Sequence, residues 1–181
     1  MTAAIPTLET DRLILRAPAL ADFEALCAFY ASERAAFVGG QMDAEDVWRQ
    51  LALEIGHWRL RGYGRWAVEE RSSGQIAGII GLWNPHGMPE PEIGWDLFSG
   101  FGGKGYATEA ASAARAYAYD VLGWTTVVSL VDPDNHASAA VAKRMGASLE
   151  GTVTRKRFGE LQVWRHLGPD DLAAGGMEAY A

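Results

Sequence analysis

The chain has 181 residues, of which 49% are hydrophobic and 22% charged, values typical of a folded globular protein rather than a disordered or fibrous one. Sixteen basic and 23 acidic side chains give a formal net charge of −7, which argues against nucleic acid as the main partner. No apolar run reaches the roughly 20 residues of a membrane span, and the first residues lack a signal-peptide pattern. We therefore expect a cytoplasmic protein that binds neither nucleic acid nor a membrane.

The first half of the chain predicts a strand, two helices and a hairpin. Residues 11–17 alternate and are rich in β-formers, which indicates a strand. Apolar side chains follow at helical spacing over residues 21–33 and again over 43–61. Two strands, 66–71 and 76–83, are joined by a short Ser-Ser-Gly segment and form a predicted hairpin.

The second half predicts strands that alternate with helices, and it has no internal repeat. The expected elements are strand 92–98, helix 105–121, strand 125–131, helix 135–145, and strands 147–154 and 162–166. This order predicts an α+β fold. We expect one domain over residues 1–181, with a core from about 8 to 165 and a loose tail over 168–181.

Cysteine and histidine offer no evident chemistry. The single cysteine, Cys27, has apolar neighbours at helical spacing, so a packed thiol is a better interpretation than a nucleophile. The four histidines are scattered without the spacing of metal ligands. We predict no metal site.

The stretch "GFGGKGYATEA", residues 100–110, combines a Gly-x-Gly-x-x-Gly pattern with the start of a helix. A dinucleotide site would need an acid about 20 residues further on, and the first acid at the end of the next strand, Asp132, lies too far along. A P-loop is excluded because Lys104 is followed by Gly105 instead of serine or threonine. A flexible turn is the plain alternative. Bare amides at a helix N-terminus beside Lys104 nevertheless favour an anion such as phosphate.

Together with its flanking segments, this loop resembles the GNAT acyltransferase superfamily, and more closely the branch that includes the ribosomal-protein alanine N-acetyltransferases. The resemblance rests on "TDRLILRAP", "EIGWDLFSGFGGKGYATEA" and "NHASAAVAKRMGA", and it covers about residues 8–165. It implies a central mixed, mostly antiparallel sheet of about seven strands flanked by about four helices. The fourth and fifth strands, 92–98 and 125–131, would run parallel and splay apart.

The resemblance also implies that acetyl-CoA is the acyl donor. Its pyrophosphate would lie on the loop that ends at Ala107, where Gly102 replaces the glutamine or arginine usual in the family, and its pantetheine arm would pair with strand 92–98. Lys143 would reach the 3′-phosphate or be a plain surface charge. The residues implied at the cofactor are Trp95, Asp96, Leu97, Gly102, Gly103, Lys104, Gly105, Tyr106, Ala107, Asn135, Ser138 and Lys143.

Two catalytic residues follow from the resemblance. The tyrosine acid of many members is absent, because its position is Ala142, and Ser138 occupies the place of the serine that the similar branch uses toward the leaving thiolate. The alternatives are a plain first-turn serine for Ser138 and a helix N-cap for Asn135. Glu92 matches a strand glutamate that acts as base, and the alternative for it is a solvent-facing acid.

The implied function is acetyl transfer from acetyl-CoA to a primary amine by direct attack. We favour a protein N-terminal α-amine, whose pKa of about 7.7 to 8.0 needs only a mild base. A polyamine, an aminoglycoside or another small amine is the alternative acceptor, and a non-catalytic CoA-binding module is the alternative function. The sequence leaves monomer and homodimer open. Four tryptophans are candidates for an acceptor pocket or for the core: Trp66, Trp83, Trp95 and Trp164.

Overall fold

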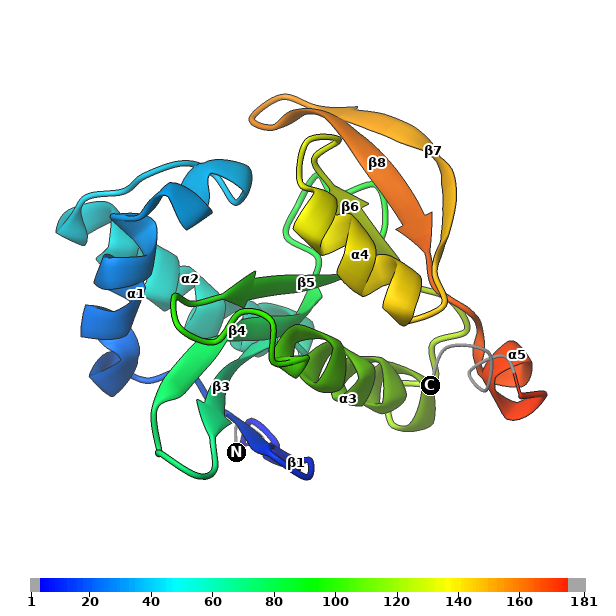
Figure 1. Cartoon of the computed structure of the whole chain (residues 1–181), viewed down its shortest axis with the longest axis horizontal. Helices are drawn as coiled ribbons and strands as arrows, with labels where there is room; N and C mark the ends of the chain where they lie inside the picture. Colours follow the sequence, from blue (N-terminus) through cyan, green and yellow to red (C-terminus); the bar gives the residue numbers. More distant parts are fainter. Residues whose placement is uncertain (1–3, 176–181) are drawn as a thin grey trace.

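An eight-stranded sheet organises the computed structural model, which describes residues 4–175 (Figure 1). The strand order is β1-β2-β3-β4-β5-β6-β8-β7, and every neighbouring pair is antiparallel except β5 and β6. The predicted α+β fold with a mixed, mostly antiparallel sheet is therefore confirmed. The strands are β1 Leu8–Glu9, β2 Leu13–Arg16, β3 Arg65–Glu70, β4 Ile76–Trp83, β5 Glu92–Leu97, β6 Val128–Val131, β7 Ser148–Arg155 and β8 Gly159–Arg165.

Five α-helices and two 3-10 helices accompany the sheet within residues 4–175. They are η1 Leu20–Asp22, α1 Phe23–Tyr30, η2 Glu33–Phe37, α2 Ala44–Arg61, α3 Tyr106–Asp120, α4 His136–Arg144 and α5 Pro169–Ala173. Figure 1 shows α3 and α4 in front of the sheet and α2 passing behind it. None of these helices has the length and apolar character to cross a bilayer.

Helix α2 has the boundaries that the sequence predicted, because both of its ends carry strong signals. The Asp43 side chain accepts a hydrogen bond from the Asp46 amide at 2.9 Å, as an N-cap should. At the other end Gly62 has a φ of +78°, a left-handed conformation that favours glycine. The predicted hairpin of β3 and β4 is also confirmed.

Several expected segments differ from the structure, among them the last strand, which begins at Gly159 and not at residue 162. The single helix over 21–33 is wrong, because the Ser32 hydroxyl bonds the Phe29 carbonyl at 2.6 Å and the chain turns there before η2. Strand β6 begins only at Val128, and the short strand β1 was not predicted. The tail is less loose than expected, since α5 lies within it; residues 176–181 are outside the described residues.

Small side chains bring α3 close to the sheet. The stripe of Ala107, Ala111, Ala114 and Ala118 is buried against the core, so the helix can approach the strands without steric conflict. Trp66 from β3 is fully buried in the same core. This packing fixes the position of the α3 N-terminus, where the glycine loop ends.

Strands β5 and β6 separate soon after they meet. Their register contains the single pair Glu92↔Val128, whereas β4 pairs with β5 from Glu92 through Leu97. The parallel pair therefore splays, as the resemblance implied, although these are the fifth and sixth strands because β1 precedes them. The edge of β5 that faces β6 is left without a partner strand beyond Glu92.

Candidate active site

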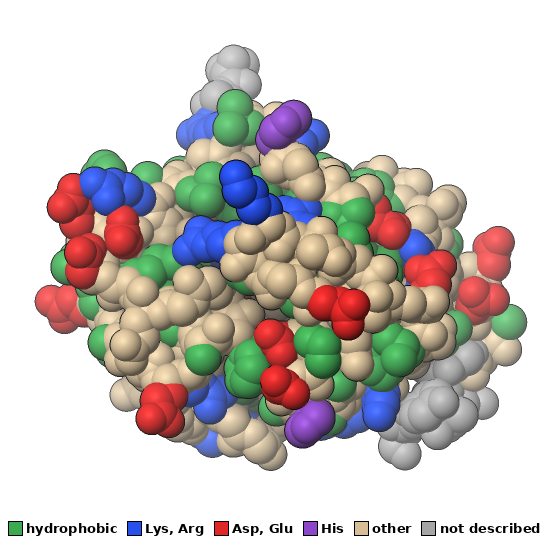
Figure 2. Space-filling view, turned by 90° about the horizontal axis from the view of Figure 1, so that it is seen from above, with side chains coloured by type: hydrophobic (Ala, Val, Ile, Leu, Met, Phe, Trp, Pro, Cys, Tyr) green, Lys and Arg blue, Asp and Glu red, His purple; other side chains and the backbone are tan. Residues whose placement is uncertain are grey.

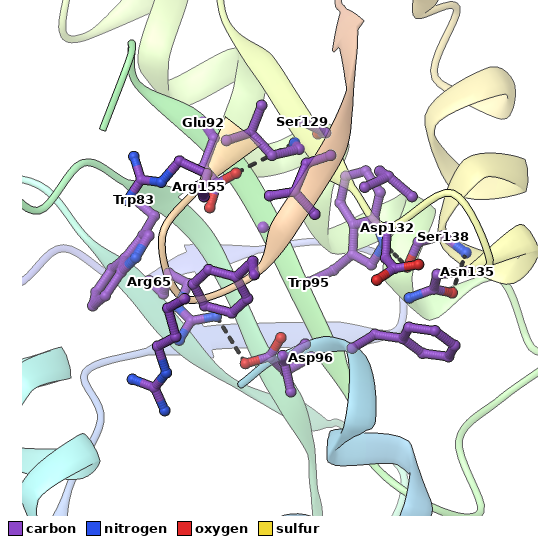
Figure 3. A pocket seen from close by; sticks show the side chains of 18 of the residues that line it. Arg65, Trp83, Glu92, Trp95, Asp96, Ser129, Asp132, Asn135, Ser138 and Arg155 are labelled. Atoms are coloured by element: carbon purple, nitrogen blue, oxygen red, sulfur yellow. Dashed lines mark hydrogen bonds and ion pairs between the residues drawn. The ribbon is translucent and has the colours of Figure 1, made fainter. Parts of the chain in front are cut away.

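Two adjoining cavities open at the splay between β5 and β6. The larger, about 250 Å³, extends toward β4, α2 and the β7–β8 turn, and the smaller, about 230 Å³, extends toward the start of α3. Trp95, Asn135 and Ser138 line both cavities. The junction at Trp95 and Ser138 is therefore where two ligands, one in each cavity, would meet (Figure 3).

The free edge of β5 presents backbone groups to the splay. The Ile93 carbonyl accepts from the Ser129 hydroxyl at 2.7 Å, and the Leu97 carbonyl accepts from Arg34 Nε at 2.9 Å. Because alternate residues of a strand point their backbone groups to the same edge, Trp95 also faces the gap. The Trp95 and Leu97 amides are thus the β5 donors available to a ligand in the splay, while Asp96 faces β4.

Glu92 is half-buried where the two strands part. One of its carboxylate oxygens accepts from the Leu130 amide at 3.3 Å. Burial raises the pKa of Glu92 to about 7, against the lowering effect of the nearby Arg65 charge. A carboxylate with this pKa is matched to proton transfer near neutral pH. Glu92 and Asp96 both line the larger cavity, and the role of Glu92 as a base stays a prediction.

Asp96 belongs to a buried ion cluster that the sequence did not signal. Arg65 Nη1 donates to Asp96 at 2.8 Å, and the same guanidinium pairs with Glu54 of α2. Arg65 also lies 4.7 Å from the centre of the Trp83 ring. Burial raises the pKa of Asp96 while the Arg65 charge opposes that rise. Of the predicted cofactor residues, Asp96 therefore has its side chain committed to Arg65.

Ser138 lies in the first turn of α4 with its hydroxyl at the junction of the cavities. The Asn135 side chain accepts from the Ser138 amide at 3.1 Å, so Asn135 is the N-cap of this helix. Trp95 Nε1 donates to Ser138 Oγ at 3.1 Å. Because the indole can only donate, it occupies a lone pair of the hydroxyl and leaves the hydroxyl proton free for another acceptor. Ala142 is buried, in line with the missing tyrosine acid.

The glycine loop presents open backbone at the start of α3. Gly103 and Gly105 have φ values of +76° and +81°, and no side chain within residues 4–175 caps the helix at Gly105. Its first amides are therefore available to an anion, whose negative charge the helix dipole favours. Arg34 Nη1 lies 4.0 Å from where a Cβ of Gly102 would be. An arginine from η2 is thus beside the position where the family usually has glutamine or arginine.

The other predicted cofactor residues are dispersed. Ala107 lines the smaller cavity. The Tyr106 hydroxyl donates to Glu70 at 2.5 Å and Lys104 Nζ lies 3.5 Å from the same carboxylate, so both side chains are directed to β3. Lys143 is exposed on α4, with Nζ 5.5 Å from the centre of the Trp164 ring.

Two of the four candidate tryptophans line the larger cavity, namely Trp83 and Trp95, whereas Trp66 and Trp164 are core residues. Within the described part of the chain, no three His, Cys, Asp or Glu side chains gather as a metal ion would require. The prediction of no metal stays a prediction.

Comparison with known proteins assigns the fold to a family. Residues 12–148 match the model of the acetyltransferase (GNAT) domain. The chain belongs to the GNAT acetyltransferase family. The crystal structure of an acetyltransferase from Agrobacterium tumefaciens str. C58 is 40% identical, with a TM-score of 0.83 over 92% of this chain and 96% of that one. YoaA of Bacillus subtilis, described as an uncharacterized N-acetyltransferase, is 29% identical over 84% of this chain and 89% of its own length.

A further GNAT neighbour has a described protein substrate. The structure of RimL, a ribosomal L7/L12 α-N-protein acetyltransferase, has a TM-score of 0.73 over 90% of this chain and 94% of that one. At 19% identity this likeness shows the fold alone. The family and its N-acetyltransferase relatives establish that the protein is an acyltransferase.

Proposed function

We propose that this GNAT protein transfers an acetyl group from acetyl-CoA to a primary amine, with a protein N-terminal α-amine as the favoured acceptor. The observation that carries the proposal is the junction of the two cavities, where the Ser138 hydroxyl meets Trp95 and from which the smaller cavity extends to Ala107 at the end of the glycine loop. Glu92, a base with a pKa of about 7, lines the larger cavity. The smaller cavity suits the cofactor arm and the larger the acceptor.

The residues divide the chemistry among themselves. Glu92 accepts a proton from the attacking amine, whose nitrogen forms the new bond to the thioester carbon. The Trp95 amide donates to the carbonyl oxygen as negative charge develops on it, which is commonly the largest electrostatic contribution in acyl transfer. As the carbon–sulfur bond breaks, the Ser138 hydroxyl donates to the departing thiolate. No covalent enzyme intermediate is needed.

The choice of acceptor follows from matching acidities. An N-terminal α-amine with a pKa near 7.7 to 8.0 is partly neutral at physiological pH, so a carboxylate with a pKa of about 7 can complete its deprotonation. A lysine or polyamine near 10.4 would need a stronger base. RimL, an α-N-protein acetyltransferase with the same fold, is consistent with this choice and with the similar branch.

A non-catalytic CoA-binding module is the second candidate, favoured only by the replacement at Gly102 and the alanine at position 142. Thiol release from acetyl-CoA in the presence of mixed amines separates the two. Calorimetric titration tests the ligand itself: we expect binding of acetyl-CoA and none of NAD. Binding of NAD with no response to CoA would contradict the proposal.

Arg34→Ala is expected to weaken acetyl-CoA binding about tenfold, the effect of losing one charge-assisted hydrogen bond. Arg34 reaches the Gly102 position from η2, and no carboxylate within residues 4–175 pairs with it. Titration should show no comparable loss for acetyl-pantetheine, which lacks the pyrophosphate, and Gly102→Arg in the Arg34→Ala background should restore binding. Arg59→Ala, on the exposed side of α2, is the control. Equal losses for both ligands would show that Arg34 acts elsewhere.

Ser138→Ala is expected to lower kcat roughly 10- to 100-fold and to leave KM for acetyl-CoA nearly unchanged. The hydroxyl is held by Trp95 and strengthens its interaction with the sulfur only as charge develops there. Steady-state kinetics with the best amine measures both constants. Ser148→Ala, an exposed serine of β7, is the control. A wild-type kcat would make Ser138 a plain helix residue.

A further inference from the structure

Two arginines that form no ion pair with any residue between 4 and 175 line the acceptor cavity. Arg155 ends β7 and Arg157 lies in the turn to β8. Six other arginines of the described residues form ion pairs, namely Arg12, Arg16, Arg49, Arg65, Arg71 and Arg165, but no carboxylate pairs with Arg155 or Arg157. In a chain with a net charge of −7, unpaired guanidinium groups at a cavity indicate a site for an anion.

Backbone contacts hold both guanidinium groups across the mouth of the cavity. Arg155 Nη1 donates to the Gly87 carbonyl at 2.5 Å, in the loop after β4. Arg157 Nη2 donates to the Gly39 carbonyl at 3.4 Å, in the loop after η2. Each guanidinium has five N–H donors, so most remain for a ligand. Arg155 is therefore positioned before a ligand arrives, whereas Arg157 is exposed and makes only the longer contact.

Acidic side chains also line this cavity, at different distances from the two arginines. Asp96 and Glu54 share the single charge of Arg65, so this buried cluster holds one more carboxylate than guanidinium groups. Asp132 accepts from the Asp134 amide at 2.9 Å and lies beside Asn135, apart from Arg155 (Figure 3). Glu92 is the acid nearest to Arg155 in Figure 3, and the Arg155 charge lowers its pKa. The anion site therefore adjoins the base that would receive the amine proton.

Basic side chains also gather on the outer surface of the molecule. The β7–β8 turn is at the top of Figure 1, so the view of Figure 2 looks down on it. Lys and Arg side chains gather in the upper middle of that face, and the nearest Asp and Glu side chains lie below and to the sides. The turn itself contributes exposed Lys156 and Arg157. A ligand that approaches from this side meets positive charge first.

We propose that Arg155 and Arg157 form a carboxylate-binding subsite, so that the acceptor is a primary amine with a carboxylate close to the amine. That the ligand of this cavity is an amine acceptor rests on the proposed function. Arg155, beside Glu92, binds the carboxylate nearest the amine, and Arg157, across the mouth, binds a second carboxylate where the acceptor has one. A free amino acid and a peptide with acidic residues at its N-terminus both have this chemistry.

The test uses matched acceptors and matched variants. One pair is an amino acid and its amide; the other is two peptides that differ only in aspartate or asparagine at the second position. Each is assayed with wild-type protein, with Arg155→Gln/Arg157→Gln, and with Arg59→Gln as a control on exposed α2. Each acceptor is compared with itself across variants, so differences in amine pKa cancel. Melting temperatures verify that the variants fold.

We expect the double variant to lose about 10- to 100-fold in kcat/KM for the carboxylate member of a pair, mainly through KM, and less than about threefold for the neutral member. Arg59→Gln should match wild type for both. If the double variant loses kcat/KM for the carboxylate member of the amino-acid pair alone, the acceptor is a free amino acid. If it loses kcat/KM for the aspartate peptide, the acceptor is a peptide with an acidic N-terminus. The proposal would be overturned if the double variant had the wild-type kcat/KM for both members of each pair.

Equilibrium binding of the same acceptors, measured with CoA present and without turnover, makes the result independent of catalysis. If CoA does not bind, the proposed function fails. The affinities of the carboxylate and amide acceptors still show whether the two arginines bind a carboxylate. If CoA binds and neither carboxylate binds more weakly to the double variant, the subsite is wrong while the proposed function stands.

Discussion

Gly105→Val is expected to lower the affinity for acetyl-CoA at least about 100-fold, the effect of losing two charge-assisted hydrogen bonds to a phosphate. Gly105 has a φ of +81°, and a β-branched residue there costs roughly 1–3 kcal/mol or forces the loop to change conformation. A side chain at this position would also lie 3.4 Å from Arg12 Nη2, which adjoins the loop. Either change displaces the amides at the start of α3. Calorimetric titration measures the affinity.

Gly62→Val separates the backbone strain from the effect on binding. Gly62 has a similar φ of +78° and open space around its Cβ position, but it caps the far end of α2. Both variants should lose stability, measured by thermal unfolding, whereas only Gly105→Val should lose the cofactor. A folded Gly105→Val protein that keeps wild-type affinity would refute the assignment of the loop to the pyrophosphate.

Glu92→Gln is expected to lower kcat/KM about 100-fold or more near pH 7, the usual contribution of a general base. Burial raises the pKa of Glu92 to about 7, so the wild-type rate should rise as pH increases through 7 and the carboxylate ionises. In the glutamine variant the rate should recover only as the pH approaches the pKa of the amine, because a neutral amine needs no base. Rates measured from pH 6 to 10 give both profiles.

Glu92→Gln is expected to raise stability although it lowers the rate. The pKa of Glu92 in the folded protein is about 7 and its ordinary value is 4.5, so the folded state loses stability as pH rises through this interval. Glu92→Gln removes the buried charge and should therefore melt at a higher temperature than wild type at pH 8. Glu24→Gln, an exposed glutamate of α1, should change neither profile. A uniform loss of rate at every pH would assign Glu92 to amine binding instead.

Local signals in the sequence were sufficient for much of the fold. The cap residues Asp43 and Gly62 marked the ends of α2, and the alternation of β-forming residues over 11–17 marked β2. The glycine loop and the alanine stripe of α3 likewise depend on residues close together in the chain. These patterns can be recognised in the sequence because a helix cap or an apolar stripe depends only on residues a few positions apart.

The ion cluster around Arg65 could not be predicted in this way. Its partners Glu54 and Asp96 come from α2 and β5, and no spacing in the chain relates them. Strand alternation correctly grouped Glu92 with Asp96, but whether that face meets water or a cavity depends on which elements cover it. The arginines of the β7–β8 turn show the same limit, because their role depends on the distant loops at Gly39 and Gly87.

Acetyl transfer itself is tested most directly by mass spectrometry of an N-terminal peptide incubated with the protein and acetyl-CoA, alongside polyamines and aminoglycosides. We predict that the peptide gains one acetyl group on its α-amine, with release of an equal amount of free CoA thiol, and that the rate falls in Glu92→Gln and Ser138→Ala. Binding of acetyl-CoA without acetylation of any amine in the panel would contradict this account.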